Sequence, residues 1–140
     1  MPNDSISSQF VIKNALLASK LSKAVGNHLS AHGISLSEYL VMYYLDNSPH
    51  KAVTRIQLAE YIGMSASGIT RLIAPMVKNK LIEKQSNPRD ARQSLVKLSK
   101  TGQRLYAEAK VSFDYSSKEL LAGLSQSQQE KIVELYAKVI

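Results

Sequence analysis

Residues 54–78 of this 140-residue chain read TRIQLAEYIGMSASGITRLIAPMVK. Thr54 and Gln57 fit a Thr-x-x-Gln capping box, which predicts the start of a short helix. Gly63 permits the positive φ of a tight turn, and Ser65 can cap a second helix that runs to about residue 79. Two short helices around such a turn are typical of a helix-turn-helix. Its buried face is expected to consist of Leu58, Ala59, Ile62, Met64, Ile69 and Leu72.

The second of these helices separates apolar from polar side chains. Its apolar residues follow the i, i+3, i+4, i+7, i+8 spacing of one helix face: Ile69, Leu72, Ile73, Met76 and Val77. The opposite face carries small, hydroxylated or basic residues: Ser67, Thr70, Arg71, Ala74 and Lys78. Such a face suits a DNA major groove about 12 Å wide, because Arg can bond guanine and Ser or Thr can reach bases or phosphates. The alternative is the solvated face of an ordinary amphipathic helix. Pro75 falls on the polar side.

Apolar spacing, capping residues and turn signals predict the remaining elements. Before the helix-turn-helix we expect a helix over 6–29 that stops at Gly33, and a helix from the Ser35/Glu38 capping box to about 45. After it we expect two strands, over 81–84 and 94–98, around a basic turn at 86–91. A long helix over 99–122 and a helix over 127–140, which opens on Ser127 and Glu130, complete the chain. The order predicts one mostly α domain with a small β-hairpin.

The net charge of +7 is concentrated in the middle of the chain. Residues 51–104 hold eleven basic and three acidic side chains, a net +8, which leaves −1 for the rest. A solvated basic face that binds nothing is the alternative, but a charge confined in this way favours a polyanionic partner such as nucleic acid.

The chain resembles the MarR family of winged helix-turn-helix transcription factors. The match lies in Asn87–Arg92, Val96–Ser99 and Gly102, which are similar to the family's wing signature, and in Leu58–Glu60 and Ile69–Leu72, which are similar to its helix-turn-helix. The resemblance implies one MarR-type domain over 1–140. Its DNA-binding part would be about 35–100, and the helical parts 5–33 and 101–140 would dimerise.

The resemblance also implies roles for individual residues. Arg92 would enter the minor groove at the wing tip, and Asp90 would orient it. Ser65, Ser67, Thr70 and Arg71 would line the major groove with Lys78 on the same face, and Lys84 and Arg89 are expected phosphate contacts. Family members carry Gly where this chain has Asn79, so Asn79 is expected to adopt the left-handed turn.

A homodimer is expected from the first and last helices. Residues 6–29 are more apolar than a surface helix requires, and residues 131–140 are rich in apolar side chains. The alternative is that both segments pack within one chain. A two-fold dimer would bind a palindrome with half-sites about 10 bp apart.

A small aromatic or lipophilic effector is a further expectation from the resemblance. Tyr39 and Tyr43 share one helix face, and His28, His32 and Phe113 are candidates to lie near them, but tyrosines at this spacing are more often core or interface residues.

His28 and His32 have metal-ligand spacing, yet the chain lacks Cys and no acidic residue adjoins them, so no metal and no cofactor are predicted.

Together these observations predict a sequence-specific DNA-binding regulator, a repressor that binds a palindromic operator as a homodimer and is released by an effector. The alternative function is a nonspecific nucleic-acid-binding or structural winged-helix module without ligand response. Catalytic motifs are lacking, so an enzyme is not expected. The sequence has no signal-peptide layout, no long apolar run and no Cys, which favours a cytoplasmic protein without a membrane role.

Overall fold

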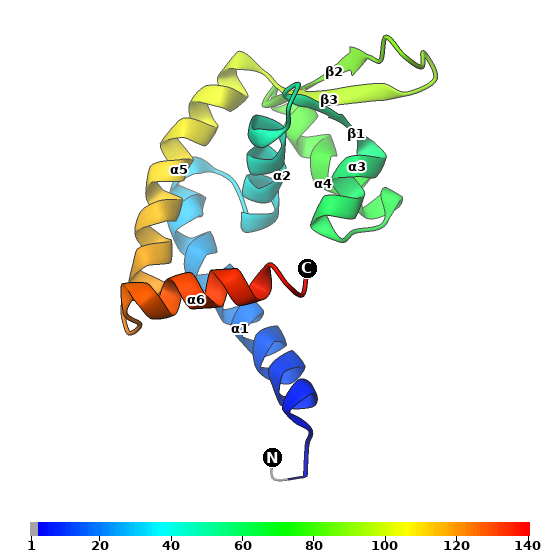
Figure 1. Ribbon diagram of the computed structural model, residues 1–140. Helices are drawn as coiled ribbons and strands as arrows, with labels where there is room; N and C mark the ends of the chain where they lie inside the picture. The colour runs from blue at the N-terminus through cyan, green and yellow to red at the C-terminus, as the bar shows by residue number, and fades with distance from the viewer. Residues whose placement is uncertain (1–2) are drawn as a thin grey trace.

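The computed structural model describes residues 3–140 and confirms a mostly helical fold with a small antiparallel sheet (Figure 1). The elements are α1 (Ile6–Leu29), the 3-10 turn η1 (Ser30–His32), α2 (Leu36–Asn47), β1 (Ala52–Thr54), α3 (Arg55–Ile62), α4 (Ala66–Lys78), β2 (Ile82–Ser86), β3 (Ser94–Leu98), α5 (Lys100–Leu120) and α6 (Gln126–Tyr136). In the described part of the chain, no helix is both long and apolar enough to span a membrane.

Helix starts follow the capping residues. Both predicted boxes are present in full: the side chains of Ser35 and Thr54 each accept an N–H from the third residue of the helix, and Glu38 and Gln57 accept the cap N–H in return. The prediction for α6 was wrong. Its box begins two residues earlier, at Ser125, because the Gln129 amide donates to the carbonyls of Leu121 and Leu124 and so holds the preceding turn.

The sheet has three strands in the order β1-β3-β2, and β1 was not predicted. Its three residues are too few to show an alternating pattern, and its place is set by antiparallel pairing of Val53 with Val96. Pairing of Lys84 with Val96 and of Glu83 with Lys97 assigns the two faces of the hairpin. Because side chains alternate along a strand, Lys84 shares the face of the buried Val96, whereas Glu83 and Lys97 lie on the opposite face.

The core of the helix-turn-helix is built largely as the apolar spacing predicts. Ile69, Ile73 and Met76 of α4 are buried, Leu72 and Val77 pack against them, and Leu58 of α3 is fully buried. Met64 is an exception, since 39% of it is exposed. It follows the left-handed Gly63, and its N–H closes the turn on the Ala59 carbonyl, so its side chain lies outside the packed face.

The end of α4 corrects the expectation for Asn79. Asn79 has φ −83°, and the left-handed residue is Lys80 with φ 60°. The Lys80 N–H donates to the Val77 carbonyl and the Leu81 N–H to that of Met76, which is the Schellman pattern of a helix end. This pattern places the left-handed position one residue later, and a lysine occupies it.

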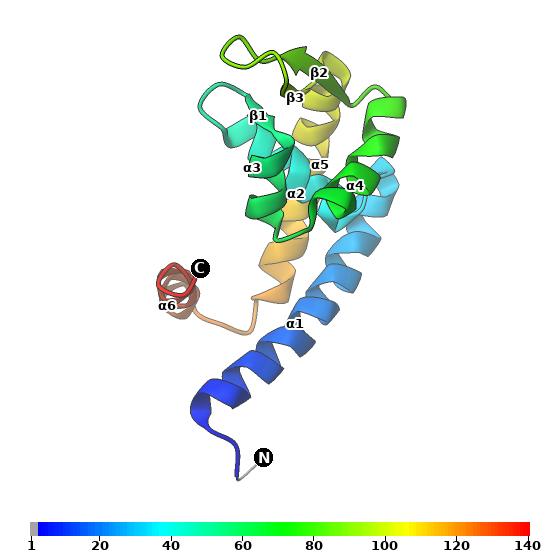
Figure 2. The ribbon, with the colours of Figure 1, turned by 90° about the vertical axis from the view of Figure 1, so that its right-hand side faces the viewer.

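The start of α1 and the whole of α6 lie outside the part of the chain that carries the helix-turn-helix and the β-hairpin. The C-terminal half of α1 packs along α5, while its N-terminal half extends beyond the body and α6 crosses it (Figures 1 and 2). No residue of α6 is buried. It meets α1 through a hydrogen bond from Tyr136 to Asn14 and through Phe10 and Tyr136, whose ring centroids are 5.9 Å apart.

Candidate nucleic-acid interface

The polar face of α4 is open to solvent along its length. Ser67, Thr70, Arg71, Ala74, Pro75 and Lys78 are all exposed. At the start of the helix the Ser65 hydroxyl oxygen accepts the Gly68 N–H at 3.1 Å and lies 3.2 Å from the Ser67 hydroxyl. The structure therefore brings the predicted major-groove residues onto one exposed surface.

Arg55 joins this surface, although the sequence-based set of contacts did not include it. It is the first residue of α3, and its Nη1 donates to the Thr70 hydroxyl oxygen at 3.3 Å. The two residues are fifteen positions apart, so their contact depends on how α3 packs on α4. The only sequence signal for Arg55 was its place among the basic residues of the middle segment.

The wing tip is organised by side chains that accept backbone N–H groups. Asp90 Oδ1 accepts the Arg92 backbone N–H at 3.0 Å and its Nε–H at 3.2 Å, while Asn87 Oδ1 accepts the Arg89 N–H at 3.0 Å. The two hydrogen bonds from Arg92 hold the pKa of Asp90 below its usual value, and the bond from the backbone N–H has the larger effect. The Arg92 side chain is 90% exposed, so Asp90 orients it without covering it.

Most cations of this surface have no carboxylate partner. Within residues 3–140, no ion pair involves Arg55, Arg71, Lys78, Lys84 or Arg89. Lys51 and Lys97, by contrast, lie 3.7 Å from Asp46 and 3.9 Å from Glu83. The unpaired cations belong to α3, α4 and the wing, and the wing lies at the end of the molecule opposite the start of α1 (Figures 1 and 2).

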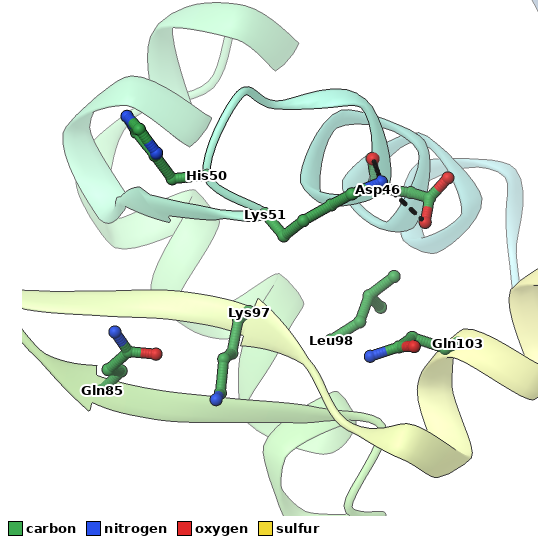
Figure 3. Close-up of a pocket in the computed structure, with 7 residues that line it drawn as sticks. All are labelled: Asp46, His50, Lys51, Gln85, Lys97, Leu98 and Gln103. Atoms are coloured by element: carbon green, nitrogen blue, oxygen red, sulfur yellow. Dashed lines mark hydrogen bonds and ion pairs between the residues drawn. The ribbon is translucent and has the colours of Figure 1, made fainter.

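A hollow of about 320 Å³ lies at the base of the wing (Figure 3). It is lined by residues from α2, the turn before β1, both wing strands and α5: Asp46, His50, Lys51, Gln85, Lys97, Leu98 and Gln103. Lys97 and Gln85 belong to the hairpin face opposite Lys84.

The candidate effector residues do not converge on one cavity. Tyr39 is 2% exposed and stacks on Phe113 with ring centroids 4.2 Å apart, and burial raises its pKa well above the usual value. Tyr43 is exposed. His32 hydrogen-bonds to Ser112 at 2.8 Å, and His28 lies 3.8 Å from Glu119. In the described chain, no three His, Asp or Glu side chains gather as metal ligands.

Solved structures with the same fold span nearly the whole chain. A transcriptional regulator of the MarR family from Rhodococcus sp. RHA1 superimposes with a TM-score of 0.88 at 18% identity, covering 98% of this chain and 96% of its own. A mutant MarR from E. coli in complex with operator DNA gives 0.81 at 19% identity, with 98% and 99% covered. The MepR–DNA complex from S. aureus gives 0.80 at 18%, with 98% and 97% covered.

The fold and the exposed α4 and wing define a winged helix-turn-helix protein. Residues 32–93 also match the sequence model of the MarR family. Over that segment the chain is therefore similar to the MarR family of transcriptional regulators, which agrees with the resemblance seen in its sequence. This is a family of regulators and not of enzymes, which agrees with the expectation from the sequence.

Proposed function

We propose that this protein is a repressor that binds a palindromic operator as a homodimer. The observation that carries the proposal is the exposed surface of α3, α4 and the wing, where Arg55, Arg71, Lys78, Lys84 and Arg89 lack carboxylate partners in the described chain. Unpaired cations bind DNA phosphates without first losing an ion pair, and they release counterions when they do so. The single domain is thus divided into a DNA-binding part, about 35–100, and dimerising helical parts.

Each element of the surface has a role in this proposal. α4 enters the major groove, where Arg71 bonds a guanine and Ser65, Ser67 and Thr70 contact bases or phosphates. Arg92 enters the minor groove at the wing tip, with Asp90 as its support. Lys78, Lys84 and Arg89 bind phosphates, which set position rather than sequence. Support for these contacts comes from exposure and charge.

The dimer in this proposal uses α1 and α6. Both helices carry large apolar side chains that the single chain leaves exposed, among them Ile6, Val11, Leu16, Val133 and Leu135. Apolar patches of this kind mark association surfaces in soluble proteins. A two-fold axis between the terminal helices would give the two copies of α4 half-sites about one DNA turn apart. Such a regulator would act on DNA in the cytoplasm.

Selective binding separates this function from the nonspecific alternative. Duplexes selected from the source genome should contain a palindrome that the protein binds about 10³-fold or more tightly than random DNA. Arg71→Ala should lose about 1–3 kcal/mol for the selected duplex and relax preference at one base pair per half-site. Lys110→Ala, an exposed lysine on α5, is the matched control and should change neither. Equal affinity for selected and random duplexes, set by salt and length alone, would favour the nonspecific module.

Release by a small aromatic or lipophilic effector is part of the same proposal. A ligand among Tyr39, Tyr43, His28 and His32 must open the Tyr39–Phe113 stack, whereas the hollow at the wing base already offers space. Ligand screening by thermal unfolding, followed by competition against the selected duplex, tests this point. A ligand that raises the melting temperature and lowers operator affinity supports release. Tyr43→Ala should weaken binding of that ligand if it lies beside Tyr39 and Tyr43, and should leave binding unchanged if it lies in the hollow at the wing base.

A further inference from the structure

The hydroxyl group of Thr70 is already engaged on both sides. Its Oγ1 donates to the Ala66 carbonyl at 3.1 Å and accepts the Arg55 Nη1–H at 3.3 Å. A threonine hydroxyl has one proton, and that proton is used within α4. Thr70 is nevertheless exposed in the middle of the helix face that meets DNA in the proposed function. With Oγ1 turned to Ala66 and Arg55, its methyl group is the part of the side chain left to meet a base.

We infer that Arg55 is a positioning residue that fixes Thr70 so that its methyl group, and not its hydroxyl, reads the 5-methyl group of a thymine. This inference rests on the proposed function, because it specifies how one residue of the DNA-binding surface selects a base. The thymine methyl lies in the major groove and is recognised by apolar contact, to which a threonine methyl is well suited. Donation of the Thr70 proton to a base would require the bond to Ala66 to break.

The position of Arg55 at the start of α3 indicates a partner for the guanidinium N–H groups that do not contact Thr70. It is the first residue of the helix, where the helix dipole disfavours a cation, and the first turn of α3 holds no acidic residue to offset this. No ion pair in the described chain uses its guanidinium. The guanidinium has five N–H donors, and the contact with Thr70 occupies one of them. A DNA phosphate is the anion that the proposed function brings to this position, so Arg55 links the backbone contact to the orientation of Thr70.

Deoxyuridine is the probe for the methyl contact, since it differs from thymidine only in that methyl. Each thymine of the selected operator is replaced in turn by deoxyuridine, and duplex affinity is measured for the wild type. One position per half-site should lose about fourfold in affinity, the value for one buried methyl group. Thr70→Val keeps the methyl shape and should retain this loss. Thr70→Ser lacks the methyl and should bind both duplexes equally.

Arg55 variants test the positioning role separately from the charge. Arg55→Gln should lower the slope of log affinity against log salt by about 2 for the dimer, which is about 1 for each copy of Arg55, and should abolish the deoxyuridine effect. Arg55→Lys keeps the charge but not the planar fork, so it should keep the salt slope and still abolish the effect. Lys110→Gln is the matched control and should change neither. A purely structural role for Arg55 would weaken all duplexes alike and leave the deoxyuridine effect unchanged.

The outcomes separate this inference from the proposed function. If the wild type prefers its operator but no thymine shows a deoxyuridine effect, or if the effect persists in Arg55→Gln, the inference is wrong and the proposed function stands. If the wild type does not distinguish the operator from random DNA, both fail. Arg55 and Thr70 lie at the surface, so equal melting temperatures are expected for all variants and confirm that each is folded.

Discussion

At the scale of one residue, Asp90 holds the side chain of Arg92, which is a proposed DNA contact, in the free protein. Its carboxylate accepts the backbone N–H and then the side-chain Nε–H of Arg92, and these bonds lower its pKa. Arg92 is therefore held at the wing tip before DNA arrives, which reduces the rotamer freedom lost on binding.

The lowered pKa of Asp90 gives a pH prediction. A group whose pKa is lower in the folded protein stabilises the fold above its unfolded pKa, and that contribution is lost as pH falls through the folded pKa. In an acid titration the Arg92 Nε–H resonance should therefore shift with a midpoint below the usual aspartate pKa. NMR titration measures this. Asp90→Asn should abolish the shift, and a midpoint at the ordinary aspartate pKa would contradict the contact.

At the scale of elements, the residues just before β2 contact the first turn of α5, where the backbone of Leu81 lies close to Gly102. A Cβ atom on Gly102 would lie 2.0 Å from the Leu81 carbonyl oxygen, which is backbone and has no room to yield. The same region is tied by Ser99, whose hydroxyl donates to the Lys80 carbonyl at 2.6 Å and whose N–H donates to the Leu81 carbonyl at 3.0 Å. The glycine of the wing signature thus has a packing reason.

Gly102→Ala should destabilise the protein by about 3 kcal/mol, at the upper end of the usual cost of overpacking, because backbone must move. Gly123→Ala is the matched control, since its Cβ would meet nothing within 4 Å. Its effect should be within about 1 kcal/mol and of either sign. Urea unfolding of both variants measures the difference. A neutral Gly102→Ala would show that Gly102 and the Leu81 carbonyl are not in contact as described.

The elements differ in how well they could be predicted from the sequence alone. Capping boxes and apolar spacing located α2, α3 and α4 because their signals are local, and the wing strands followed from the turn between them. β1 and the contact of Arg55 with Thr70 were missed, since both depend on partners far along the chain. The Asn79 expectation failed because the left-handed position lies one residue later, at Lys80. The start of α6 was misplaced because two overlapping capping boxes lie there, one from Ser125 and one from Ser127.

The whole molecule divides by charge and by burial along the same boundary. The segment with net +8 contains α3, α4 and the wing, whereas the terminal helices belong to the near-neutral remainder and hold half of the exposed large apolar residues. A lone α6 with no buried residue would be marginal in water, because short helices gain most of their stability from packing of an apolar face. A second copy of the chain would supply that packing.

The dimer is tested by placing a charge on the exposed apolar face. Val133→Asp and Leu16→Asp alter side chains that are 68% and 61% exposed in the single chain, so neither should unfold it. Both should shift a micromolar sample from dimer to monomer in sedimentation velocity. Operator affinity should then fall by about 10²–10⁴, because the second half-site no longer binds at high effective concentration. Thr101→Asp introduces the same charge at an exposed site outside α1 and α6 and should remain dimeric. A wild type that sediments as a monomer would refute the dimer directly.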